Sequence, residues 1–296
     1  MNNEWAFLPM RSSNDLLGDD RALRERMAED SYLYFEQVLP APALRRIRHD
    51  IASILGRHGM IRGGDDLMRA VSISEPVREG DDEYFAVHDE IQRLESFHSF
   101  AHHEVLRTLM RSVLGDSAFP HPLKVVRLGF PGHHEVSTPP HQDYPNNQGT
   151  PDLTASWIPL GAVPMELGGL AVLRGSAAAG VLPLARHLGP GTRQCVGPPE
   201  LLEELHWVST DFALGDVLLF PSTTVHASLH NASEFNMRLS IDFRWQREGA
   251  ALTPIVLEPH FGRLTWPEVY AGWRSEEYQY YWRGLDYEVV PFEEFP

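Results

Sequence analysis

Two residues of metal-ligand type, His141 and Asp143, are the side chains of this sequence best suited to chemistry. They stand in the run PPHQD at residues 139–143, and a further histidine, His226, lies far downstream. Two imidazoles and one carboxylate are the ligand set of a facial-triad iron(II) site, which leaves the opposite positions open for substrates and oxygen. Residues i and i+2 of an extended segment point to the same side. We therefore expect His141 and Asp143 to meet at one ion, Gln142 to face away, and His226 to come from a neighbouring strand.

The composition is that of a soluble globular protein. The chain has 296 residues, of which 43% are hydrophobic and 22% charged. Its formal net charge of −16 argues against nucleic acid or an anionic membrane as a partner. The single cysteine, Cys195, excludes an intrachain disulfide and fits a reducing cytoplasm. The first residues do not resemble a signal peptide, and no apolar run reaches membrane-spanning length. We expect a cytoplasmic protein without a membrane segment.

The first third of the chain reads as helical. Residues 20–30 are charged with apolar positions at helical spacing, and residues 32–39 read as a short strand. A helix is predicted to begin at Pro42 and to run through Ile47, Ile51 and Leu55. Residues 91–114 indicate two more helices. These segments supply apolar faces that can cover a sheet.

From residue 124 onward, short β-type runs alternate with glycine and proline. The expected strands are residues 124–130, 153–160, 169–173, 216–220 and 237–245. Many short strands without alternating helices favour an antiparallel sandwich or barrel. The fold class is therefore mainly β with helical additions. We expect one domain over residues 1–296, with a helical part to about residue 120, a β core over about 121–247, and an aromatic, acidic extension over 248–296.

Residues 237–245 show the clearest alternation in the sequence. One face carries Arg238, Ser240, Asp242 and Arg244, and the other carries the apolar residues Met237, Leu239, Ile241, Phe243 and Trp245. If the apolar face packs against the helices, the polar face points into the barrel. Arg238 then lies in its mouth near the metal, where a guanidinium can grip a carboxylate through two hydrogen bonds.

In its ordered set of motifs, the chain resembles the phytanoyl-CoA dioxygenase family of iron(II)- and 2-oxoglutarate-dependent oxygenases. Arg238 follows His226 by twelve residues, as in that family. The other matching pieces are HQD at 141–143, SWIPL at 156–160, GGLAVLRGS at 168–176, GDVLLF at 215–220 and HASLHN at 226–231. The likeness covers roughly residues 20 to 247. It implies a double-stranded β-helix, or jelly roll, covered by the N-terminal helices.

The resemblance also implies roles for residues of the site. His141, Asp143 and His226 would hold iron(II), and Arg238 would bind the distal carboxylate of 2-oxoglutarate, with dioxygen as the third reactant. Three further residues match positions beside the cosubstrate: Ser228 assists the arginine, Trp157 borders the pocket, and Thr138 supplies a polar contact. The sequence departs from the family pattern at Ala177-Ala178, which leaves these positions intact.

The implied reaction is hydroxylation of a small molecule, in specialised metabolism, with release of succinate and carbon dioxide. Asp143 favours hydroxylation over halogenation, because halogenating relatives have a small residue there. Desaturation, epoxidation or ring closure stay open, as does the oligomeric state. For the substrate, Arg127, Arg174, Arg193 and Arg244 could bind an acidic molecule, whereas the aromatic C-terminal residues could enclose an apolar one.

Other interpretations compete with this one. The chain could be a metal-binding jelly-roll protein without redox chemistry, such as an isomerase or a ligand-binding module, or a relative that has lost activity. Arg238 could pair across strands on the surface, Trp157 could belong to the core, and Ser228 could cap a turn. The remaining candidate histidines lack a partner at the His-x-Asp spacing and are expected to bind no metal: His102, His103, His133, His134 and His230.

Overall fold

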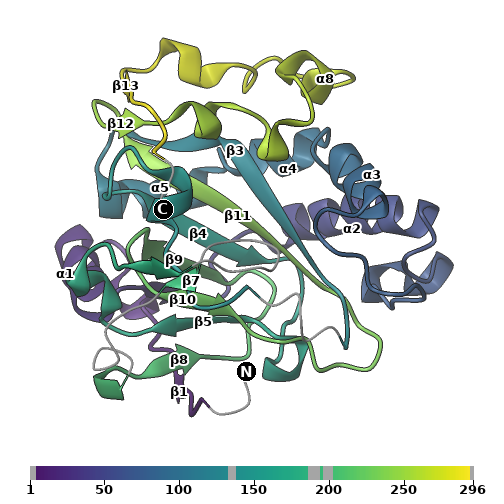
Figure 1. The fold of residues 1–296 in the computed structure, drawn as a ribbon, viewed down its shortest axis with the longest axis horizontal. Coiled ribbons are helices and arrows are strands. Elements are labelled where there is room, and N and C mark those ends of the chain that lie inside the picture. The colour runs from purple at the N-terminus through teal and green to yellow at the C-terminus, as the bar shows by residue number, and fades with distance from the viewer. Residues whose placement is uncertain (1–4, 133–137, 186–193, 196–202, 294–296) are drawn as a thin grey trace.

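Two sheets form the centre of the computed structural model, which describes residues 5–132, 138–185, 194–195 and 203–293 (Figure 1). The larger sheet has the strand order β2-β9-β4-β11-β3. Its strands are antiparallel and comprise β2 (Leu33–Phe35), β9 (Val217–Pro221), β4 (Thr154–Pro159), β11 (Arg238–Arg247) and β3 (Ala118–Gly129). The smaller sheet comprises β1 (Leu8–Pro9), β8 (Trp207–Ser209), β5 (Leu170–Leu173) and β10 (His226–Ser228) in that order, with β1 parallel to β8.

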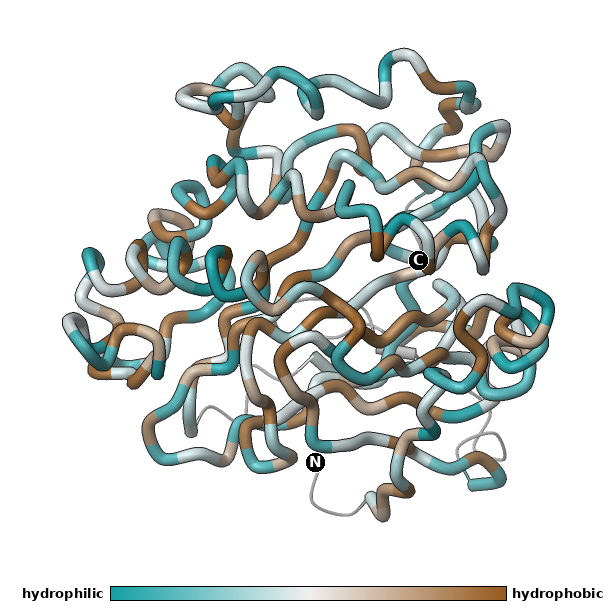
Figure 2. The backbone as a smooth tube through the Cα atoms, turned by 180° about the vertical axis from the view of Figure 1, so that it is seen from behind, coloured by the Kyte–Doolittle hydropathy of each residue, from teal (hydrophilic) through white to brown (hydrophobic). Residues whose placement is uncertain are grey.

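The two sheets pack face to face through a shared apolar layer. Tyr34, Trp157 and Phe220 of the larger sheet cluster with Leu170 and Val172 of the smaller one. In Figure 2 many of the hydrophobic stretches lie in the middle of the molecule, and many of the outer turns are hydrophilic. The architecture is mainly β with helical additions, as the sequence predicts.

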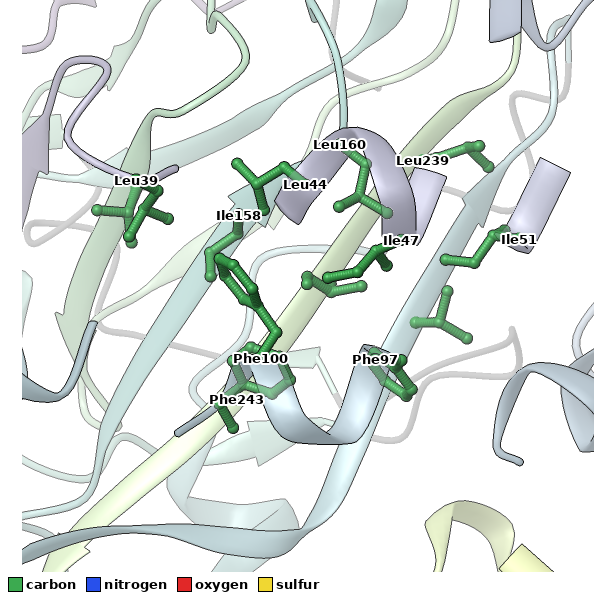
Figure 3. Packing of buried hydrophobic residues seen from close by; sticks show 14 of the residues in the cluster. Leu39, Leu44, Ile47, Ile51, Phe97, Phe100, Ile158, Leu160, Leu239 and Phe243 are labelled. Carbon is green, nitrogen blue, oxygen red and sulfur yellow. The ribbon is translucent and has the colours of Figure 1, made fainter. Parts of the chain in front are cut away.

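Helices cover the outer face of the larger sheet. Ile47 and Ile51 of α2 and Phe97 of α4 belong to the same buried cluster as Leu239 and Phe243 of β11 (Figure 3). The alternation of residues 237–245 therefore places its apolar face under the helices, as expected. The helices of this region are α1 (Asp20–Asp30), α2 (Ala41–Arg57), α3 (Asp82–Ile91), α4 (Glu95–Phe100) and α5 (Glu104–Leu114).

Several elements differ from the sequence-based expectation. β3 begins at Ala118 rather than at residue 124, although Pro120 and Pro122 argue against a strand. The structure tolerates them because β3 is an edge strand and its pairing with β11 is irregular between Phe243 and Trp245. Helix α3 was not expected, and neither were the short strands β1 and β8, which are too short to show alternation, whereas β10 is the strand that was expected to carry His226.

The C-terminal residues fold over the edge of the larger sheet that is formed by β3 (Figure 1). Trp266, Tyr270 and Trp282 form an aromatic cluster of their own, and Trp273 donates its indole N–H to the carbonyl of Arg93 at 3.0 Å. The strands of this region are β12 (Ala251–Leu252) and β13 (Glu288–Val289), and its α-helix is α8 (Trp266–Tyr270). Its short 3-10 helices are η7 (Pro254–Leu257), η8 (His260–Gly262) and η9 (Tyr281–Gly284). Among the described residues, no helix is both long and apolar enough to cross a membrane.

Candidate metal centre

The three predicted metal ligands meet between the two sheets. His141 and His226 form an antiparallel bridge, with N–H to O distances of 2.9 and 3.0 Å in the two directions. One oxygen of Asp143, Oδ1, lies 3.9 Å from Nε2 of each imidazole. The ligand atoms of all three residues lie within 4.8 Å of one another, and all three side chains are buried. The structure thus brings together the set that the sequence singled out.

The backbone reaches this arrangement differently from the extended segment that we expected. Asp143 has φ −73° and ψ −30°, which are helical values, and it is the N-cap of the short helix α6 (Tyr144–Asn147). Its carbonyl accepts a hydrogen bond from Asn147 Nδ2 at 2.8 Å. Gln142 does face away, because its amide binds Gly180 O and the backbone N–H of Leu182, each at 2.8 Å. Asp143 therefore approaches from a helical turn and His141 from a β-bridge.

Both imidazoles present Nε2 to the centre. Nδ1 of His141 lies 2.8 Å from the carbonyl oxygen of Pro139, and Nδ1 of His226 lies 3.1 Å from that of Thr224. A carbonyl can only accept, so each Nδ1 carries the proton and each Nε2 keeps a lone pair. Burial lowers the pKa of both histidines, and for His141 the neighbouring His226 adds to this effect. Both rings are therefore neutral ligands at neutral pH.

The carboxylate of Asp143 is oriented by Arg244. Nη2 of Arg244 donates to Oδ1 at 2.8 Å, whereas the buried Oδ2 has no hydrogen-bond partner among the described residues. Burial raises the pKa of Asp143, but the net shift holds this pKa below its usual value, and Arg244 is the largest lowering cause, through its charge and its hydrogen bond. Two neutral imidazole nitrogens, an ionised carboxylate and an orphaned buried oxygen fit an iron(II) ion.

The predicted cosubstrate residues line a small cavity beside this centre. Arg238, Ser228, Trp157 and Thr138 border a space of about 30 Å³ together with His141 and His226. Nη1 of Arg238 donates to the Ser228 hydroxyl at 2.8 Å and to the carbonyl oxygen of Gly168.

The guanidinium of Arg238 keeps capacity for another partner. Its Nε has no hydrogen-bond partner among the described residues. Burial, together with the nearby Arg127, lowers the pKa of Arg238 to about 10, so the group stays cationic at neutral pH. The cavity therefore offers a desolvated cation to an anion. Trp157 is fully buried and its indole N–H donates to Ser240 Oγ at 3.1 Å, so it belongs both to the core and to this wall.

A second, larger cavity of about 570 Å³ opens on the same centre. His141, Asp143 and Thr138 border it on the metal side. Residues 254–255, 258–262 and 292 of the C-terminal extension form much of the remaining wall. This volume falls in the range of sites that hold drug-sized molecules.

Three of the arginines that we considered for an acidic substrate are engaged with carboxylates. Arg127 pairs with Asp242 at 3.0 Å, and Arg244 bridges Asp242 and Asp143. Arg174 binds Asp30 at 2.7 Å, and Arg193 lies outside the described residues. Arg127 and Arg244 also line the larger cavity, so their part in binding an acidic substrate stays a prediction. The polar alternation of residues 238–244 predicted that Asp242 and Arg244 face the interior, but not which side chains they bind.

The histidines that were expected to bind no metal lie apart from the centre where they are described. His102 stacks on Tyr278 with ring centroids 4.2 Å apart, and His103 accepts from the backbone N–H of Val105 at the start of α5. Neither these two nor His230 joins a metal-ligand cluster within the described part of the chain. His133 and His134 lie outside it.

Several solved structures of known proteins have a similar architecture. The epimerase SnoN from nogalamycin biosynthesis, in a complex with Fe3+, α-ketoglutarate and nogalamycin RO, is 20% identical, with a TM-score of 0.57 over 79% of this chain and 86% of that one. The α-ketoglutarate-dependent carbocyclase SnoK from the same biosynthesis is 18% identical, with a TM-score of 0.55 over 83% and 90%. AviO1 from Streptomyces viridochromogenes Tue57 is 19% identical, with a TM-score of 0.52 over 78% and 96%.

These likenesses show a shared fold. The family described as phytanoyl-CoA dioxygenase (PhyH) matches residues 27–240, which include all three candidate ligands and Arg238. The cofactors predicted from the sequence, iron(II) with 2-oxoglutarate and dioxygen, agree with this match and with the His-Asp-His centre. The chain belongs to the phytanoyl-CoA dioxygenase family.

Proposed function

We propose that this protein is an iron(II)- and 2-oxoglutarate-dependent oxygenase that hydroxylates a small molecule in specialised metabolism. The observation that carries this proposal is the buried His141–Asp143–His226 cluster with Arg238 in the wall of the adjoining cavity. A metal-binding module without redox chemistry needs the first feature but not the second. Arg238 therefore favours the oxygenase over the non-redox alternative.

Each residue of the site has a proposed task. His141, Asp143 and His226 hold the ion, and Arg238 binds the distal carboxylate of 2-oxoglutarate, with Ser228 orienting its guanidinium. Trp157 and Thr138 border the cosubstrate, and the backbone N–H of Ser228 donates to the carbonyl of Thr138 at 3.1 Å, which joins these two walls. When bound together, iron(II), 2-oxoglutarate and dioxygen supply an oxidant for an unactivated C–H bond, with succinate and carbon dioxide as co-products.

The larger cavity is the proposed substrate site. It borders His141 and Asp143, so a molecule held there lies next to the ion. Because the C-terminal extension forms much of its wall, we propose that residues 1–296 act as one catalytic domain. A location in the cytoplasm stays a prediction from the single cysteine.

Hydroxylation is the outcome that we propose, and the structural relatives set its alternatives. SnoN is an epimerase and SnoK a carbocyclase, so this fold hosts other outcomes in those proteins. Asp143 occupies the carboxylate position, which argues against halogenation here. Mass spectrometry of the product distinguishes the three outcomes. Hydroxylation adds one oxygen atom, epimerisation leaves the mass unchanged, and oxidative ring closure removes two hydrogen atoms.

The test is an anaerobic titration of the protein with iron(II) and then 2-oxoglutarate. A weak visible charge-transfer band is expected, because both keto-acid oxygens chelate the ion. Admission of air is then expected to convert 2-oxoglutarate slowly into succinate without any added substrate. A variant in which both His141 and His226 are replaced by Ala lacks the two imidazole ligands and should show neither signal. Absence of both the band and succinate in the native protein would contradict the proposed function and favour the non-redox alternative.

A further inference from the structure

A histidine outside the family motifs lines the larger cavity. His260 lies in η8 of the C-terminal extension and borders the same space as His141 and Asp143. Its Nδ1 is 3.1 Å from Nε2 of His88, a fully buried residue of α3. The two imidazoles come from segments far apart in the chain, so this contact fixes the extension against the helical layer.

The direction of this hydrogen bond follows from a neighbouring glutamine. Nε2 of Gln92 donates to the carbonyl oxygen of Lys124 at 3.2 Å and lies 3.3 Å from Nε2 of His88. An amide nitrogen can only donate, so Nε2 of His88 accepts and carries no proton. The proton of His88 is then on Nδ1, which lies 3.7 Å from Asp89 Oδ1 and makes no hydrogen bond among the described residues.

The same logic assigns the proton of His260. Nε2 of His88 has one lone pair, which the shorter contact to Nδ1 of His260 at 3.1 Å shares with Gln92 at 3.3 Å, so Nδ1 of His260 is the donor in the bond between the two imidazoles. Nε2 of His260 then keeps its lone pair, and the ring that carries it borders the cavity. Burial lowers the pKa of His260, and the neighbouring His88 adds to this effect, so the ring is neutral at neutral pH. The cavity therefore contains a hydrogen-bond acceptor of fixed orientation.

The ring is also held by packing and by an unusual backbone. Phe261 stacks on His260 with centroids 3.8 Å apart and lies 4.7 Å from the ring of His88. Phe261 has φ +67°, a left-handed conformation that is strained for a residue with a side chain. Arg263, which follows this turn, pairs with Asp89 of α3 at 3.2 Å. Strained backbone that its surroundings hold in place is typical of functional positions.

The other polar groups of the cavity include acceptors, although the side-chain amides of Asn146 and Asn147 and the hydroxyl of Thr138, which can donate, also line it. Glu79 and Glu258 contribute carboxylates to its lining, whereas the cations Arg127 and Arg244 are paired with Asp242 and Asp143. The apolar part of the wall includes Ile255, Phe261 and Phe292. A complementary molecule carries hydrogen-bond donors at one edge and an apolar body.

We propose that His260 is a specificity-determining residue whose Nε2 accepts a hydrogen bond from a hydroxyl or amine group of the substrate. The substrate class is a small molecule with an apolar ring or chain and several such donors. His88 is the positioning residue that sets the tautomer and orientation of His260. The inference rests on the proposed function, because the cavity is a substrate site only through its opening on the metal centre.

The proton assignment is tested directly by nitrogen-15 NMR of the histidine-labelled protein. His260 should appear as the neutral tautomer protonated on Nδ1 at pH 7, and its signals are identified by their loss in His260→Gln. This measurement needs neither metal nor turnover. A His260 ring protonated on Nε2, or on both nitrogens, would overturn the proposal even if the protein proves to be an oxygenase.

The substrate class is tested with three probes built on one aryl glucoside scaffold. These are 4-nitrophenyl β-D-glucopyranoside, its 2-amino-2-deoxy analogue, and the tetra-O-methyl derivative, which has no donors. Calorimetry is performed on the metal-free protein and on the anaerobic iron(II)–2-oxoglutarate complex. The native protein should bind at least one donor-bearing probe about fivefold or more tighter than the methylated one. The relative affinities of the first two distinguish a hydroxyl from an amine donor.

Variants then assign this preference to His260. His260→Phe keeps the ring and its stacking on Phe261 and should reduce the preference to less than about twofold, whereas His260→Gln restores an acceptor and should recover part of it. The control His49→Phe removes an exposed imidazole of α2 and should change nothing. Equal binding of all three probes, binding of none, or an unchanged preference in His260→Phe would each overturn the proposal. Failure of the proposed function would instead appear as a missing charge-transfer band.

Discussion

Arg244 binds one oxygen of Asp143 and leaves the other without a partner. Nη2 of Arg244 lies 2.8 Å from Oδ1, whereas Oδ2 is buried and makes no hydrogen bond to the described residues. Arg244 is itself held by Asp242, whose Oδ2 lies 3.3 Å from Nη1. A ligating carboxylate whose second oxygen is hydrogen-bonded cannot rotate freely. Arg244 therefore prepares Asp143 to bind a metal through a single oxygen.

Arg244→Met should weaken iron(II) binding by roughly 10- to 100-fold, because it removes the hydrogen bond that orients Asp143 and the charge that keeps it ionised. Anaerobic titration with iron(II), or with cobalt(II) followed by its visible absorption, measures this change. Arg247→Met, at an exposed position near the end of the same strand, is the matched control and should bind the ion as the native protein does. Equal affinities of the Arg244 and Arg247 variants would show that Arg244 does not orient the ligand.

Arg238→Met should separate cosubstrate binding from metal binding. The loss of a charged hydrogen-bond donor from a buried site should weaken 2-oxoglutarate binding by roughly 10- to 100-fold. Iron(II) affinity should stay within about threefold, because Arg238 makes no contact with the ligands. Titration of the charge-transfer band with 2-oxoglutarate measures the first quantity and metal titration the second. A similar fall in both affinities would argue against the assigned role.

Ser228→Ala provides a graded version of the same test. The hydroxyl accepts from Nη1 of Arg238 at 2.8 Å, so its loss leaves the guanidinium in place but less well oriented. We expect 2-oxoglutarate to bind roughly three- to tenfold more weakly, an effect of one neutral hydrogen bond. An effect as large as that of Arg238→Met would mean that Ser228 contacts the cosubstrate itself.

Gly168→Ala should destabilise the fold around the cosubstrate cavity. Gly168 has φ +74°, and a Cβ there would lie 2.5 Å from backbone atoms of Leu229 and His230. The substitution should lower the free energy of unfolding by about 2 kcal/mol or more, as measured by urea denaturation. Gly63→Ala is the control, because Gly63 has ordinary φ and nothing near its Cβ position. Comparable losses in the two variants would refute the steric argument.

The metal centre could be predicted from the sequence because its ligands belong to an ordered set of motifs. His141, Asp143 and His226 needed only the His-x-Asp spacing and the resemblance, and the placement of Arg238 followed from strict alternation along β11. The role of Arg244 was missed although the same alternation placed it on the correct face. Its partner Asp143 is distant in the sequence, and local patterns do not report which distant side chains pair.

The contact between His88 and His260 was invisible for the same reason, and in addition no motif covers residues beyond about 247. The start of β3 was missed because Pro120 and Pro122 locally oppose a strand, and only its place at the sheet edge makes them acceptable. The helical turn at Asp143 was missed because the spacing of two ligands fits an extended chain and a capped turn equally well. Tertiary context decided each of these cases.

Lys124 offers a prediction on pH dependence. It is the only lysine of the sequence and is fully buried, and its ammonium donates to the carbonyl oxygen of His121 at 2.7 Å. Burial lowers the pKa of Lys124 from its ordinary value to about 7. Because the chain has one lysine, its side-chain NMR signal can be followed without ambiguity, and it should titrate near pH 7 in the folded protein. A signal that titrates only near pH 10 would contradict this.

Stability should follow the same titration. In the unfolded chain a lysine keeps its proton up to about pH 10.4, whereas the folded protein releases it near pH 7. The unfolded state therefore binds more protons between these values, so the free energy of unfolding should rise as the pH increases from 7 towards 9, by up to about 1 kcal/mol per pH unit. Burial also lowers the pKa of His98 and His121, to about 3 and 4, and these groups change stability only below about pH 6.5.

Urea denaturation at pH 7.5, 8.2 and 9.0 should show this rise in the native protein and a flatter profile in Lys124→Met, since methionine keeps the apolar stem and cannot titrate. Parallel profiles for the two proteins would show that Lys124 is not the group responsible.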